Sequence, residues 1–122
     1  MTIGHRIWAI AEGHIPSEGL EDYALLSHET ACILNTGDEA ADIHITLYFA
    51  DKDPVGPYHV RVPARRTLHL RFNELEDPEP VPRDTDFAVV LEASVPVVVQ
   101  HTRLDSRHPN VALMTTMAFA SG

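Results

Sequence analysis

The sequence predicts an all-β protein, an antiparallel β-sandwich of the jelly-roll type with about eight strands, in a single domain spanning residues 1–122. Three observations support this fold class. Apolar and polar residues alternate with a period of two in several segments, as in strands with one buried face. Segments rich in Gly and Pro separate these strands, and no segment shows a helical period. A chain of this length can also bury one substantial core.

The first part of the chain contains five expected strands. The clearest is residues 42–50, "DIHITLYFA", in which the apolar side chains fall on one face and the polar side chains on the other. A long irregular loop is expected at 12–23. The short connection "PARR" at 63–66 predicts a hairpin between the fourth and fifth strands. The five strands are expected at 7–12, 28–35, 42–50, 58–62 and 67–72.

Three further strands are expected at 87–93, 97–104 and 112–120. In the strand expected at 97–104, the side chains change from apolar to ionisable. After the valines, every second position is ionisable: His101, Arg103, Asp105 and Arg107. Alternate strand residues share a face. This pattern predicts a polar pocket or a subunit junction, in which Arg103 and Asp105 could pair. A solvated strand end and a catalytic site are the alternatives.

The charge distribution is uneven. The formal net charge of -9 argues against strong nonspecific affinity for nucleic acids. No carboxylate occurs between Pro54 and Asn73, however, and this segment contains four arginines. The predicted hairpin would present them as a basic ribbon. We weigh a solvated sheet face against a docking surface for an anionic group or an acidic partner. These arginines are Arg61, Arg65, Arg66 and Arg71.

Enzymatic, metal and cofactor functions have little support. The eight histidines show no H-x-H spacing, and the single cysteine excludes a C-x-x-C motif. Ser27, His28 and Asp105 could be written as a catalytic triad, but there is neither a nucleophile elbow nor a Gly-rich phosphate loop. We therefore expect no enzyme activity, no metal and no cofactor. The sequence also shows no signal peptide and no bilayer-spanning apolar run, which predicts a cytoplasmic protein.

Several long blocks of the sequence resemble the soluble sensory rhodopsin transducer family. They include "WAIAEGHIP", "VPARRTLHLRFNEL", "VPVVVQHTRLDSR" and the closing "ALMTTMAFA", and the resemblance extends from about residue 3 to residue 121. It implies a cytoplasmic β-sandwich that forms a homotetramer, binds the cytoplasmic side of a membrane sensory rhodopsin and relays its light state. DNA contact in transcriptional regulation, and binding of sugars or other small ligands, are further functions that the resemblance suggests.

The polar positions within these blocks form the candidate site. They fit a binding pocket or a subunit interface built from strand ends, and each has a structural alternative: Trp8 as a core residue, and Asp51 as a turn cap. The pocket or interface candidates are Trp8, Glu12, His28, Glu29, Asp51, His101, Arg103, Asp105 and Arg107. The candidates for docking a partner or an anion are Arg61, Arg65, Arg66 and Arg71.

Overall fold

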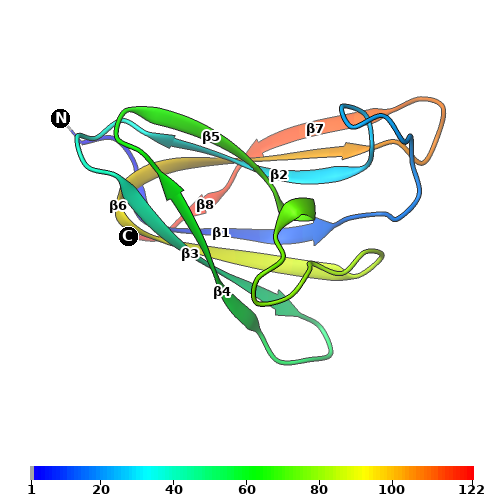
Figure 1. Ribbon diagram of the computed structural model, residues 1–122, viewed down its shortest axis with the longest axis horizontal. Helices are drawn as coiled ribbons and strands as arrows, with labels where there is room; N and C mark the ends of the chain where they lie inside the picture. Colours follow the sequence, from blue (N-terminus) through cyan, green and yellow to red (C-terminus); the bar gives the residue numbers. More distant parts are fainter. Residues whose placement is uncertain (1) are drawn as a thin grey trace.

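The computed structural model describes residues 2–122, and β-strands make up most of it (Figure 1). All strand pairs are antiparallel, and the helical content of the described residues is one short turn, so the predicted class is confirmed. The elements are β1 (His5–His14), β2 (His28–Asn35), β3 (Ala41–Phe49), β4 (Val55–Val62), β5 (Arg66–Arg71), η1 (Phe72–Glu74), β6 (Asp86–Asp105), β7 (Ala112–Met117) and β8 (Phe119–Ala120).

Two sheets share the long strand β6. Its first part, up to Val97, pairs with β1 and β3 in a sheet of order β4-β3-β6-β1-β8, which we call sheet A. Its second part, from Val98, pairs with β2 and β7, and β5 completes this sheet B beyond β2. The two separate strands predicted at 87–93 and 97–104 are therefore one strand of 20 residues. Pro96 is tolerated because it lies in a register shift of the ladder with β1.

The predicted hairpin at "PARR" is wrong. β4 pairs with β3 in sheet A, whereas β5 pairs with β2 in sheet B, so this connection crosses from one sheet to the other. The amide of Asn35 donates hydrogen bonds to the carbonyls of Val62 and Pro63, each at 3.2 Å, and so fixes the start of the crossing. Arg65 then turns the chain with a φ of 57°, and its N–H donates to the carbonyl of Gly37.

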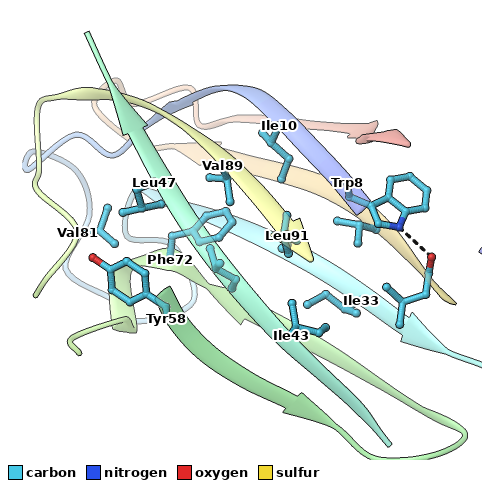
Figure 2. Packing of buried hydrophobic residues seen from close by; sticks show 14 of the residues in the cluster. Trp8, Ile10, Ile33, Ile43, Leu47, Tyr58, Phe72, Val81, Val89 and Leu91 are labelled. Atoms are coloured by element: carbon cyan, nitrogen blue, oxygen red, sulfur yellow. Dashed lines mark hydrogen bonds between the residues drawn. The ribbon is translucent and has the colours of Figure 1, made fainter. Parts of the chain in front are cut away.

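The inward faces of the two sheets enclose the apolar core (Figure 2). Ile33, Ile43 and Leu91 are among its fully buried side chains. Trp8 is 4% exposed, and its indole N–H donates to the carbonyl of Val97, 2.9 Å away, at the point where β6 leaves sheet A. This bond satisfies a buried polar group and joins β1 to the changeover between the sheets.

Candidate functional site

A group of charged side chains with a buried centre lies between the sheets at one end of the sandwich. Glu29 of β2 is completely buried, and its two carboxylate oxygens are bound by the ring of His101 and by Nε of Arg103, both from β6. Nη1 of Arg103 lies 3.3 Å from the carboxylate of Glu12 on β1. We call Glu12, Glu29, His101 and Arg103 the ionic cluster.

The strand periodicity turns Glu29, His101 and Arg103 toward the inside. Glu29 precedes the buried Ala31 and Ile33 on the same face of β2, and His101 and Arg103 follow buried valines on the same face of β6. Glu29 is directly opposite Arg103 in the ladder between these strands. Sheet A completes the arrangement through Glu12 and through the N–H of His14, which lies 3.4 Å from the carboxylate of Glu29. The ionic cluster therefore links the two sheets.

The charges of the ionic cluster stabilise one another. Burial alone would lower the pKa of Arg103, but its hydrogen bonds and charge interactions with Glu29 and Glu12 outweigh burial and raise that pKa. The Arg103 side chain is 22% exposed, although its Nη2 is buried and has no hydrogen-bond partner among the described residues. Removing one partner from such a group would leave a buried charge uncompensated, so the group holds its strands together.

Two hollows lie near this cluster. The larger, which we call the loop pocket, has a volume of about 1090 Å³ and forms where the β1–β2 loop, η1 and the β6–β7 loop meet. The smaller, of about 460 Å³, lies at the C-terminal ends of β1 and β3, beside the start of β6, and includes Glu12 in its wall. The side chains that shape the loop pocket include Tyr23, Ser27, Arg71, Arg83, Ser106 and Arg107.

A family model described as "Anabaena sensory rhodopsin transducer" matches residues 3–120 of the chain. The chain belongs to this family. A solved structure of the Anabaena sensory rhodopsin transducer is 57% identical over 84% of this chain and 99% of that chain, with a TM-score of 0.74. A crystal structure of the Thermotoga maritima protein 1070 is 38% identical over 97% of this chain and 96% of that chain, with a TM-score of 0.87. No curated protein matches the chain.

In this transducer family member, the structure brings four of the predicted site residues into contact. Glu12, Glu29, His101 and Arg103 form the ionic cluster, and the alternation along β6 accounts for two of them, His101 and Arg103, which share one face. The suggested pairing of Arg103 with Asp105 is wrong, because Arg103 binds glutamates. Asp105 instead pairs with Arg107, whose Nη2 lies 2.6 Å away, and these hydrogen bonds lower the pKa of Asp105 to about 2.

Three other predicted residues lie apart from the cluster. Trp8 is a core residue, because its ring is buried and its N–H is bonded within the fold. The ring Nδ1 of His28 is 2.7 Å from the carbonyl of Leu26, and Asp51 is exposed in the β3–β4 loop. The residues of the suggested triad also have other partners, since the Ser27 hydroxyl donates to the carbonyl of Glu18 and accepts from the N–H of Ser106.

The four arginines of the predicted basic ribbon do not form one surface, because β4 and β5 belong to different sheets. Arg61 pairs with Asp42 at 3.3 Å, and Arg65 pairs with Asp38 at 2.6 Å. Arg66 is exposed and donates to the carbonyl of Arg65. Arg71 turns toward the β1–β2 loop, where its guanidinium lies over the ring of Tyr23.

Sequence reasoning missed most of the loop pocket. Tyr23, Ser27, Arg83 and Ser106 come from three segments that are far apart in the chain. None of these segments has a periodic pattern that would indicate which of them meet. One signal was present in the sequence, namely Arg71 at the end of the fifth strand and Arg107 just after the sixth, but the residues that surround them in the pocket could not be identified without the fold.

Proposed function

We propose that the protein is a cytoplasmic, non-enzymatic adaptor that binds the cytoplasmic face of a microbial sensory rhodopsin and relays its light state. The main support is the family membership over residues 3–120, together with the 57% identity to the Anabaena sensory rhodopsin transducer. No helix within residues 2–122 is both long and apolar enough to cross a bilayer. The proposed receptor would supply the membrane-spanning part of the complex.

The charge of the protein suits such a receptor. Loops on the cytoplasmic side of membrane proteins are enriched in Lys and Arg, and the net charge here is -9. Exposed carboxylates gather in the β3–β4 loop and in residues 74–86, and Lys52 and Glu79, 3.6 Å apart, join these two segments. We infer that this acidic end faces the receptor, since complementary charge speeds and orients association.

A pair of charge reversals tests this assignment by titration against a detergent-solubilised sensory rhodopsin. Glu76→Lys places the reversal at the acidic end, and Glu39→Lys, in the β2–β3 loop at the opposite end of β3, is the matched control. Both residues are exposed, and both changes alter the net charge equally. We expect Glu76→Lys to weaken binding about three- to tenfold and Glu39→Lys to have little effect. Equal effects would contradict the proposed orientation.

We further propose that the adaptor is a homo-oligomer, a tetramer as the family resemblance implies. The support is an apolar surface on the last two strands. All six residues of β7 are exposed and none is charged, and Leu113 and Phe119 are 68% and 71% exposed. An exposed, uncharged edge strand is an unusual feature for a monomer, because it favours pairing with another strand.

The DNA-contacting alternative has less support. Nucleic-acid binding draws most of its affinity from cationic side chains that contact phosphates together. Here Arg61 and Arg65 are each neutralised by an aspartate, and the arginines of β4 and β5 lie on different sheets.

A further inference from the structure

The loop pocket has the features of a ligand site. Its volume of about 1090 Å³ is just above the range of about 300 to 1,000 Å³ that is typical of small-molecule sites. It is separate from the ionic cluster, because none of the four cluster residues lines it. It lies at the end of sheet B where the loop after β1, the turn after β5 and the loop after β6 converge.

Two arginines in its wall keep an uncompensated charge. Arg61, Arg65, Arg103 and Arg107 each pair with a carboxylate. Arg71 and Arg83 have no such partner within residues 2–122. Both line the loop pocket. In a protein with a net charge of -9, two unpaired guanidinium groups at one hollow are a notable departure from the overall charge.

Backbone carbonyls hold both guanidinium groups in place. Nη1 of Arg71 donates to the carbonyl of Tyr23 at 2.8 Å, and its Cζ lies 4.0 Å from the centre of the Tyr23 ring. Arg83 donates to the carbonyls of Val81 and Asn73, at 2.7 and 3.1 Å. A carbonyl orients a guanidinium without neutralising its charge. Each group has five N–H donors, so several remain for a carboxylate or a phosphoryl group.

The acidic residues around the pocket do not cancel this charge at close range. The carboxylate of Glu74 accepts the hydroxyl of Tyr23, and this hydrogen bond raises the pKa of the tyrosine. Glu18 lies near Arg107, whose pKa is raised mainly by its hydrogen bonds with Asp105. Glu21, the remaining carboxylate of the wall, is exposed on the loop.

The β1–β2 loop that forms one wall is held against the sandwich by two buried serines. Ser27 donates to the carbonyl of Glu18 at 3.0 Å, and the N–H of Leu20 donates to Ser106 at 2.9 Å. Gly19, between them, has a φ of +151°, and a Cβ there would lie 2.5 Å from the Ser106 hydroxyl. The loop therefore packs too closely for a side chain at this position, which keeps the pocket preformed.

We propose that the loop pocket binds a small anionic metabolite, a polycarboxylate or a phosphorylated sugar, whose acidic group is held by Arg71 and Arg83. Such a ligand would supply the negative charge that these guanidinium groups lack inside the protein. The Tyr23 ring, already stacked on Arg71, would contact the body of the ligand. This proposal does not depend on receptor binding, so each can fail without the other.

Calorimetric titration of the full chain with citrate, glucose 6-phosphate and glucose tests the proposal. We expect one of the two anions to bind saturably and to raise the melting temperature, while glucose does neither. Binding of citrate alone would identify a carboxylate ligand, and binding of glucose 6-phosphate alone would identify a phosphoryl ligand. Glucose binding as tightly as its phosphate, or no anion binding at millimolar concentration, would overturn the proposal.

Substitutions of single arginines test whether the anion binds in the loop pocket. Arg83→Gln should weaken anion binding about tenfold or more, because it removes charge-assisted hydrogen bonds, and Arg83→Lys should weaken it less. Arg66→Gln is the matched control, since Arg66 is also exposed and has no carboxylate partner, but lies outside the pocket. Melting temperatures without ligand separate lost binding from lost folding. Equal losses in Arg83→Gln and Arg66→Gln would show that the pocket is not the binding site.

Discussion

At the scale of single residues, the ionic cluster is the most unusual feature of the molecule. A carboxylate with no exposed surface requires compensation, because removing a charge from water is unfavourable by several kcal/mol. Glu29 obtains it from His101 and Arg103, each of which binds a different oxygen. The ionisable residues that follow the valines of β6 thus close the core at one end of the sandwich and join its two sheets.

Replacing Glu29 tests this role. Glu29→Gln keeps the size of the side chain but leaves Arg103 without its buried counter-charge, so we expect the free energy of unfolding to fall by about 3 kcal/mol. Glu12→Gln, at the exposed end of the same arginine, should lower it by about 1 kcal/mol or less. Urea denaturation of the three proteins measures both values. Equal stabilities of Glu29→Gln and the parent protein would show that the buried charge is dispensable.

The lowered pKa of Asp105 predicts that the free energy of unfolding decreases at strongly acidic pH. Its side-chain hydrogen bonds with Arg107 lower the pKa from 3.8 to about 2, so the folded state favours the ionised form. This stabilisation is present above pH 4 and is lost as the pH falls toward 2, and solvent screening limits it to about 1 kcal/mol. Asp105→Asn should therefore flatten the stability profile between these pH values. A parent profile that is already flat there, or an unchanged profile in the variant, would contradict this account.

At the scale of elements, β6 determines how the two sheets are joined. It pairs with β1 and β3 before the changeover and with β2 and β7 after it. Trp8 holds the changeover through its bond to the carbonyl of Val97. Gly4 packs against the same residue, with a φ of +111° and room for no Cβ. Two residues at the start of the chain therefore fix the position at which β6 passes from sheet A to sheet B.

Removing the indole N–H should weaken this junction. Trp8→Phe leaves the Val97 carbonyl buried without its donor and reduces core packing, so we expect a loss of about 2 to 3 kcal/mol in unfolding free energy. Tyr48→Phe, at an exposed position on β3, is the control and should change stability by less than about 0.5 kcal/mol. Circular dichroism during denaturation is the suitable readout, since Trp8 is the only tryptophan. Equal unfolding free energies of Trp8→Phe and the parent protein would show that the Trp8 side chain does not stabilise the passage of β6 between the sheets.

The strands could be predicted from the sequence because their alternation is local, and the segment around Ile43 and Ile45 shows it most clearly. Sheet membership could not be predicted. "PARR" has the length of a hairpin turn, but the hydrogen bonds of Asn35, a residue nearly thirty positions earlier, direct the chain across to the other sheet. Of the candidate site, strand parity placed His101 and Arg103 on one face, but their contact with Glu29 depends on the pairing of β2 with β6, which could not be predicted. The loop pocket depends on contacts between distant loops, which no local pattern reveals.

At the scale of the whole molecule, the last two strands present an apolar surface that an isolated copy would leave in water. Leu113 and Met117 lie on one face of β7 and are 68% and 52% exposed. β7 pairs with β6 on one side, and the described residues provide no strand for its other edge. Assembly with further copies would bury this surface and would also concentrate the negative charge that suits a basic receptor surface.

Sedimentation velocity tests this assembly. We expect the parent protein to sediment as a tetramer, and Leu113→Lys combined with Met117→Lys to shift it to a smaller species, because two charges cannot be buried in an apolar contact. Tyr48→Lys, at a 44% exposed aromatic residue on the other sheet, is the control and should leave the tetramer intact. A monomeric parent protein, or a double variant that remains tetrameric, would contradict assembly through β7.

The most direct test of the adaptor function is a calorimetric titration of the protein into a detergent-solubilised sensory rhodopsin, with dark and illuminated receptor measured side by side. The proposed function predicts saturable binding whose affinity changes with illumination, because a relay of the light state requires different affinities for the two receptor states. Absence of binding in both states, or equal affinity in both, would contradict it.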